Sequence, residues 1–176
     1  MTIETAQTVI IAAPIAATWD YAQDVERWAE IMPGYQSCQI IDDDNSLWVL
    51  KIGVGGLVRT VKVDVHVDRW AGPEEVDFTF KLQGDPVEGS GTYRAERADA
   101  DYTSVTLAVK VNGSGPMAPM WEAMGGPVLP RFARGFAEEL KGRIEAQAGV
   151  APIPSPPPGP SPLARFIAWL KGLLGR

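Results

Sequence analysis

The chain has 176 residues, 45% of them hydrophobic and 22% charged, which suits one globular domain with room for a short appendage. A formal net charge of −6 argues against nucleic-acid binding. Cys38 is the only cysteine, which excludes an internal disulfide and a cluster of thiolate ligands. The first residues do not resemble a secretory signal, and no apolar run reaches the length of about 18 residues that a membrane-spanning helix needs. We therefore expect a cytoplasmic protein.

The first part of the chain predicts one strand followed by two short helices. Residues 3–12 have strand character, and Pro14 stands where a helix can begin because its missing N–H is not needed there. The helices are expected over residues 15–22 and 25–31, the second ending at Pro33-Gly34.

The middle of the chain predicts about six antiparallel strands joined by turns. The clearest pattern runs from Val61 to Val67, where valines alternate with Lys62, Asp64 and His66, so that one face is buried and the other is wet. The expected strands cover residues 37–41, 47–54, 61–67, 76–82, 87–95 and 105–111.

A helical period follows the last strand. Apolar residues recur every three or four positions over 127–148, and residues 117–124 predict a preceding helical turn that breaks at Gly125-Gly126-Pro127. The order of elements predicts an α+β fold over residues 1–148, in which a curved antiparallel sheet wraps around the long C-terminal helix.

Residues 149–162 form a linker, because seven of these fourteen residues are proline. Such a composition cannot form a core and favours an extended polyproline II conformation. The composition therefore predicts a domain boundary at Gly149.

Residues 163–176 predict an amphipathic helix that lies on a membrane. Ser161 and Pro162 are favourable at a helix start, and at about 1.5 Å per residue the helix would be roughly 20 Å long, too short to cross a hydrocarbon core of about 30 Å. It is basic, whereas residues 1–160 hold thirteen basic and twenty-two acidic residues. A groove on a partner protein and the chain's own domain are the alternative docking sites. The predicted membrane-binding residues are Leu163, Phe166, Ile167, Trp169, Leu170, Leu173 and Leu174, with the basic Arg165, Lys171 and Arg176.

We expect no catalytic and no metal site. His66, the only histidine, is predicted on the solvent face, and Cys38 lacks a basic neighbour that would activate it. No phosphate-binding loop or metal-ligand spacing occurs, and the acidic run at residues 42–44 is interpreted as a solvated turn.

The interior is the remaining candidate site. Gly89 and Gly91 are predicted to face inward and to leave volume unfilled beneath the sheet, while flexible methionines and two tryptophans gather near the expected cavity mouth. These residues favour a pocket for a lipid-like ligand, and the alternative is that they are ordinary core residues. The predicted cavity residues are Trp28, Met32, Phe78, Phe80, Gly89, Gly91, Leu107, Met117, Met120, Trp121, Met124, Phe132 and Phe136.

Several motifs resemble the START-like (SRPBCC), helix-grip superfamily. They are Ala13-Pro14-Ile15, Trp19-Asp20, the segment from Trp28 to Gly34, and Glu88-Gly89-Ser90-Gly91-Thr92. More narrowly, Pro119-Met120-Trp121-Glu122-Ala123-Met124-Gly125-Gly126-Pro127 followed by Leu129-Pro130-Arg131-Phe132-Ala133 is similar to the CoxG family of carbon monoxide dehydrogenase proteins, over about residues 2–147.

The resemblance implies a non-catalytic accessory protein of the molybdenum-containing carbon monoxide dehydrogenase. It implies recruitment of that enzyme to the cytoplasmic face of the cell membrane, and a cavity for an isoprenoid quinone such as menaquinone. The alternatives are a membrane tether without a ligand and a cyclase-type enzyme on the same fold.

Overall fold

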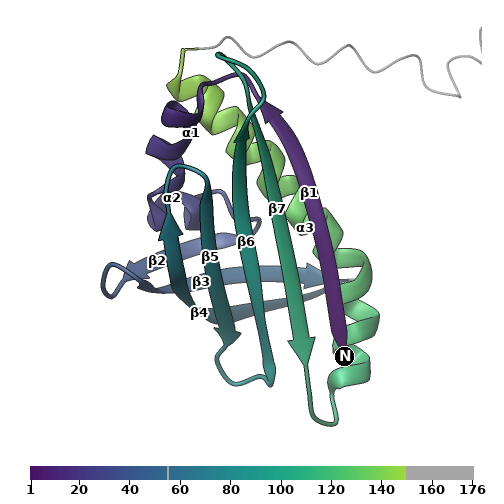
Figure 1. Cartoon of the computed structure of the whole chain (residues 1–176). Coiled ribbons are helices and arrows are strands. Elements are labelled where there is room, and N and C mark those ends of the chain that lie inside the picture. Colours follow the sequence, from purple (N-terminus) through teal and green to yellow (C-terminus); the bar gives the residue numbers. More distant parts are fainter. Residues whose placement is uncertain (55, 150–176) are drawn as a thin grey trace, which may run out of the picture.

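The computed structural model describes residues 1–54 and 56–149, apart from the side chains of Val54, Leu57 and Met124. One sheet of seven strands, two short helices and one long helix make up this part of the chain (Figure 1). The elements are β1 (Thr2–Ile11), α1 (Ile15–Ala22), α2 (Val25–Glu30), β2 (Tyr35–Ile40), β3 (Asn45–Val54), β4 (Leu57–Ala71), β5 (Glu75–Leu82), β6 (Val87–Arg97), β7 (Thr103–Gly113) and α3 (Ala118–Gln147).

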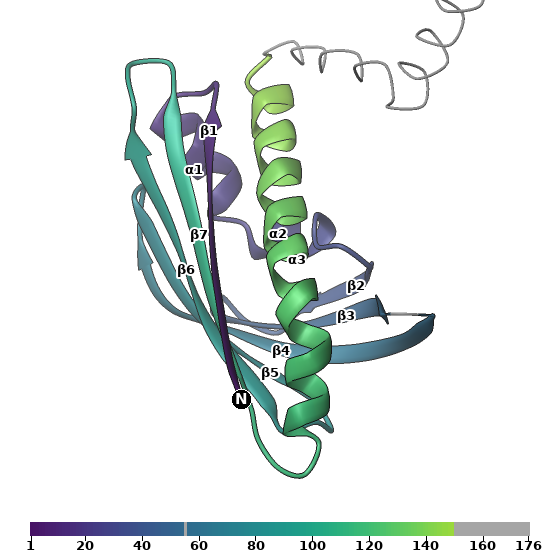
Figure 2. The ribbon, with the colours of Figure 1, turned by 90° about the vertical axis from the view of Figure 1, so that its right-hand side faces the viewer.

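The sheet is antiparallel throughout, with the strand order β1-β7-β6-β5-β4-β3-β2. β1 pairs with β7 from Thr2 opposite Asn112 to Ile11 opposite Thr103, so the first strand of the chain lies beside the last. β4 spans 15 residues, and its register against β5 shifts between Val67 and Arg69. A shift of this kind increases the local twist of a sheet, which accords with the strong curvature seen in Figure 2.

The long helix α3 packs against the concave side of the sheet (Figure 2). This arrangement confirms the predicted fold class, a curved antiparallel sheet around a long C-terminal helix. α3 ends at Gln147, and Gly149 has a positive φ of 75°, a conformation that favours glycine after a helix. Apart from Gly149, the predicted linker (residues 149–162) and the predicted terminal helix (residues 163–176) lie outside the described residues and remain predictions.

The predicted break at residues 125–127 is wrong, because α3 runs without interruption through Gly125, Gly126 and Pro127. Gly125 has a packing role instead: a Cβ added there would lie 2.8 Å from Cδ1 of Ile3 on β1. The helix therefore approaches the sheet closely at this point, and this contact favours a continuous helix over the local preference of Gly and Pro to end one.

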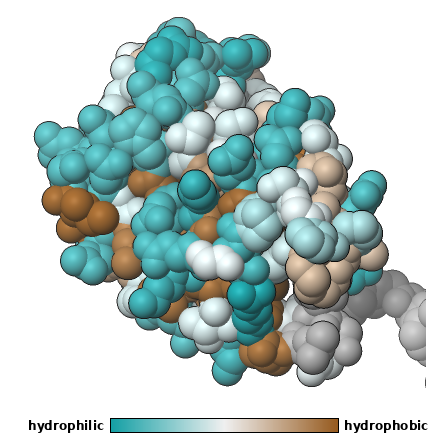
Figure 3. Space-filling view, turned by 90° about the horizontal axis from the view of Figure 1, so that it is seen from below, coloured by the Kyte–Doolittle hydropathy of each residue, from teal (hydrophilic) through white to brown (hydrophobic). Residues whose placement is uncertain are grey.

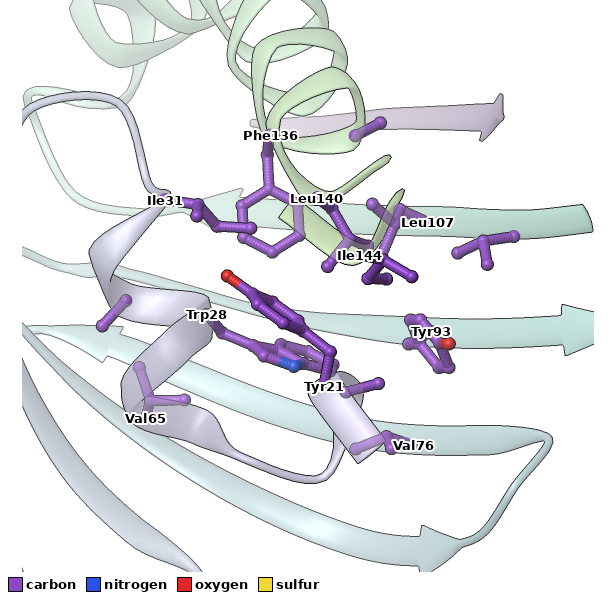
Figure 4. Close-up of a cluster of buried hydrophobic side chains, with 14 of the residues drawn as sticks. Tyr21, Trp28, Ile31, Val65, Val76, Tyr93, Leu107, Phe136, Leu140 and Ile144 are labelled. Carbon is purple, nitrogen blue, oxygen red and sulfur yellow. The ribbon is translucent and has the colours of Figure 1, made fainter. Parts of the chain in front are cut away.

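The core is centred on aromatic side chains between α2, α3 and the sheet (Figure 4). The ring of Trp28 contacts those of Phe78, Tyr93 and Phe136 at centroid distances of 5.8, 5.6 and 6.2 Å. Asp24 caps α2 by accepting hydrogen bonds from the N–H groups of Glu26 and Arg27, which fixes the helix that carries Trp28.

Within residues 1–54 and 56–149, no helix combines the length and the apolar character that crossing a membrane would require.

Candidate functional site

A cavity of about 270 Å³ lies between the concave face of the sheet and α3. Its walls are the inward-facing side chains of the strands, the α2 region and the first half of α3. Eight predicted cavity residues line it: Trp28, Met32, Phe78, Phe80, Leu107, Trp121, Phe132 and Phe136.

A second wall, absent from the residues predicted from the sequence, is formed by the inward rows of β3 and β4. Trp48 and Leu50 on β3, and Val61, Val63 and Val65 on β4, also line the cavity. Their alternation is visible in the sequence. A curved sheet was predicted as well, but not that its curvature brings these two strands around to face α3.

Gly89 and Gly91 face the concave side as predicted, but the volume beneath them is not empty. A Cβ added at either glycine would lie 2.3 Å from Cζ of the phenylalanine opposite, Phe80 for Gly89 and Phe78 for Gly91. The two rings cover the glycines, a known way to protect glycine within a sheet. The rings, rather than the glycines, line the cavity.

The predicted cluster of methionines at the cavity mouth is only partly present. Met32 lines the cavity, whereas Met117 and Met120 are 50% and 38% exposed and lie outside its lining. The Met124 side chain lies outside the described residues. Seen from the end at which β1 and α3 begin, hydrophobic surface shows between hydrophilic residues (Figure 3). Met1, Trp121 and Gly125 contribute to the cavity at this end.

The described cavity lining is entirely apolar, with no charged, hydroxyl, carboxamide or imidazole side chain. Nε1 of Trp48 donates a hydrogen bond to Oγ of Ser46 at 2.9 Å. Nε1 of Trp28 and the hydroxyl of Tyr93 are buried without a hydrogen-bond partner among the described residues. Burial raises the pKa of Tyr93, so its hydroxyl stays protonated at neutral pH. Such a site is suited to holding an apolar molecule and offers no acid–base pair.

The polar residues considered as catalytic or metal-binding candidates lie outside this cavity, and His66 lies on the solvent face of its strand as predicted. The His66 side chain is 49% exposed, and its Nδ1 lies 2.8 Å from Oδ1 of Asn45. Burial, and to a lesser extent nearby carboxylates, raises the pKa of Cys38 to about 11, which makes it a poor nucleophile. The Asp42 carboxylate accepts hydrogen bonds from the N–H of Asp44 and from the side chain of Asn45. These bonds lower the pKa of Asp42 and stabilise the tight turn at residues 42–45. No cluster of three metal-binding side chains occurs among the residues that the structure describes.

Comparison with known families decides the affiliation. The model of the family described as polyketide cyclase/dehydrase and lipid transport matches residues 11–137. The chain belongs to this family. The polyketide cyclase/dehydrase and lipid transport family thus covers most of the sheet and the part of α3 that lines the cavity.

The individual relatives are distant. A candidate polyketide cyclase of Streptomyces cyaneus is 40% identical over 37 residues. The match covers 21% of this chain, and the chain thus spans only about a quarter, 24%, of the length of that relative. A conserved protein from Geobacillus kaustophilus has a TM-score of 0.71 at 16% identity, covering 83% of this chain and 96% of that one. The Zhui aromatase/cyclase of a Streptomyces species has a TM-score of 0.62 at 21% identity, covering 86% of this chain and 100% of that one. A START superfamily protein from Mycobacterium smegmatis has a TM-score of 0.63 at 16% identity, covering 81% of this chain and 97% of that one. At these identities the likeness shows the START-like fold alone.

Proposed function

We propose that the chain is a CoxG-type accessory protein that binds an isoprenoid quinone, such as menaquinone, and carries it between the cytoplasmic membrane and a molybdenum-containing carbon monoxide dehydrogenase. The observation that carries this proposal is the cavity of about 270 Å³ with an apolar described lining. Lipid transport is also part of the description of the family to which the chain belongs.

The chemistry of the lining favours a neutral ligand. Burying an ionised carboxylate or phosphate without a partner is very unfavourable, and no cationic side chain lines the described walls. A quinone ring is neutral, flat and largely apolar. It suits walls made of aromatic rings such as Trp28, Phe78 and Phe136.

The size of the cavity limits what it encloses. Ligand pockets usually measure about 300–1,000 Å³, and this one lies just below that range. It has room for a bicyclic ring with the beginning of an isoprenoid chain. The rest of a long chain would extend out of the cavity.

The C-terminal segment supplies the proposed membrane location. An amphipathic helix with three basic residues, on a stiff linker of fourteen residues, would hold the domain near a bilayer and leave it free to reach an enzyme. The location is therefore the cytoplasmic face of the membrane, by peripheral attachment.

A pair of neighbouring substitutions tests whether a quinone binds inside the cavity. Val63 lines the cavity, and Lys62 is exposed on the other face of the same strand. Val63→Phe should abolish the quenching of tryptophan fluorescence by a short-chain menaquinone, and Lys62→Phe should leave it unchanged. Quenching that is equal in both variants would place the quinone outside the cavity and refute the proposal. A simple tether would recruit the dehydrogenase equally well with either substitution.

A polyketide cyclase is the second candidate, favoured by the family description and by the aromatase/cyclase among the structural neighbours. A cyclase needs a group that transfers protons, and the described lining holds only tryptophan N–H donors. Turnover of a poly-β-ketone substrate that is lost in Trp28→Phe and kept in Trp48→Phe would favour the enzyme over the carrier.

A further inference from the structure

Arg59 lies on β4 at a position where the alternation of the strand predicts an apolar, inward-facing residue. The inward row of this strand continues through Val61, Val63 and Val65, all of which line the cavity. Arg59 lies two residues before Val61 and pairs with Ile52 of β3, which also lines the cavity. Because side chains alternate between the two faces of a strand, Arg59 belongs to the concave face, at the end of the row of cavity-lining valines.

The guanidinium of Arg59 connects β4 to two other parts of the chain. Its Nη1 and Nη2 donate hydrogen bonds to Oδ1 and Oδ2 of Asp85, at 3.1 and 2.7 Å, in the connection between β5 and β6. Its Cζ also lies 5.8 Å from the ring centroid of Trp121 on α3. The Trp121 ring in turn lines the cavity.

Of the two side chains in the Arg59–Asp85 ion pair, only that of Asp85 is mostly buried. The Asp85 side chain is 13% exposed and holds the guanidinium with a two-bond fork, whereas the Arg59 side chain is 54% exposed. An exposed ion pair and a cation–π contact contribute less than the burial of large apolar side chains deeper in the core. The contact at Trp121 can therefore open at lower cost than the packing deeper in the core.

We propose that Arg59 and Asp85 form a clasp that positions Trp121 as a movable wall of the cavity and sets how fast molecules enter and leave. Arg59 is thus a positioning residue that acts through Trp121. The part of this inference that concerns ligand exchange rests on the proposed function. The movement of the wall can be tested without any ligand.

A cysteine within the cavity reports opening of the wall. In the full chain carrying Cys38→Ala and Val63→Cys, the thiol at position 63 faces the cavity, and its reaction with methyl methanethiosulfonate requires the reagent to enter. Adding Arg59→Gln should accelerate this reaction about three- to thirtyfold, since it removes two charge-assisted hydrogen bonds and the cation over the ring. High salt should accelerate it in the parent chain but not in Arg59→Gln.

Two further variants separate the clasp from a general loss of charge. Arg69→Gln removes an arginine of equal exposure, 54%, which pairs with Glu75 and Asp77 on β5 and has no cation–π contact with Trp121 among the described residues. It should leave the labelling rate unchanged. Asp85→Asn should act in the same direction as Arg59→Gln, and the double variant should be no faster than the faster single variant, because both remove one interaction.

The outcomes distinguish the two proposals. Equal labelling in the parent chain and Arg59→Gln, or equal acceleration by Arg69→Gln, would overturn the clasp. Arg59→Gln and its parent, both with Cys38→Ala and with Val63 retained because a thiol in the cavity would add covalently to the quinone, then receive 2-methyl-1,4-naphthoquinone in stopped-flow quenching. The clasp predicts faster association and dissociation with a smaller change in affinity. Faster labelling in Arg59→Gln, together with no quenching of the parent chain by the naphthoquinone, would retain the clasp and contradict the quinone proposal.

Discussion

The ring of Phe78 covers Gly91 on the neighbouring strand, so that a Cβ at position 91 would lie 2.3 Å from Cζ and within 3 Å of two further ring atoms of Phe78. The same ring meets Trp28 edge-on, at an interplanar angle of 85°. Gly91 therefore sets the position of a cavity wall through the residue that lies on it.

Gly91→Ala should push the Phe78 ring toward the cavity and lower the free energy of unfolding by about 1–3 kcal/mol, as overpacking commonly does. Urea denaturation measures this change. Ser90→Ala, at the adjacent exposed position, is the matched control and should change stability by less than about 0.5 kcal/mol. An equal effect of the two substitutions would mean that Phe78 is not held by Gly91.

The alternation in the strands and the helical period in the helices were sufficient to predict the strands, the inward face and most of the aromatic cavity wall. It could not reveal that Phe78 covers Gly91, because that depends on the register between β5 and β6, which local pattern does not fix. The course of α3 has a similar explanation. Gly125 and Pro127 favour a break locally, and the close contact with Ile3 that accompanies a continuous helix is a tertiary feature.

The two glycines in α3 differ in surroundings and should differ in their response to alanine. A Cβ at Gly126 meets nothing within 4 Å, so Gly126→Ala should stabilise the protein by up to about 1 kcal/mol through helix propensity. Gly125→Ala must displace the end of Ile3 and should gain clearly less, and Gly125→Val should lose about 1–3 kcal/mol. Thermal unfolding of the three variants tests the order. Equal stabilisation by the two alanines would contradict the close helix–sheet contact.

Buried polar groups offer a second paired test. The Tyr93 hydroxyl has no partner among the described residues, so Tyr93→Phe should leave stability unchanged or raise it by about 1 kcal/mol. Ser46→Ala, by contrast, leaves the buried N–H of Trp48 without its acceptor and should cost about 1–3 kcal/mol. A marked loss of stability in Tyr93→Phe would show that the hydroxyl has a partner in solution.

The thiol of Cys38 should react slowly. With its pKa raised to about 11 from 9.0, the reactive thiolate is roughly a hundredfold scarcer at pH 8 than in an unperturbed thiol. Alkylation by iodoacetamide should accelerate with pH up to about 11. The folded state retains this proton more strongly than the unfolded state, so the contribution to stability is complete below about pH 9 and is lost as the pH rises toward 11. Cys38→Ala should remove this part of the alkaline loss, and an alkylation rate that levels off near pH 8 would contradict the raised pKa.

The C-terminal segment makes a prediction of its own. The full chain should sediment with anionic liposomes, and a chain ending at Gly149 should not. Leu170→Asp should weaken sedimentation because it places a charge in the predicted apolar stripe, and added salt should weaken it through the basic residues. Equal sedimentation of the truncated chain would refute the membrane anchor.

The proposed carriage of an apolar molecule in the cavity is tested most directly by mass spectrometry of the organic extract of the full chain purified from a menaquinone-producing host. The proposal predicts menaquinone in amounts approaching one per protein. It should be lost in Val63→Phe and retained in Lys62→Phe. An extract without quinone, or with equal amounts from the two variants, would contradict the proposal.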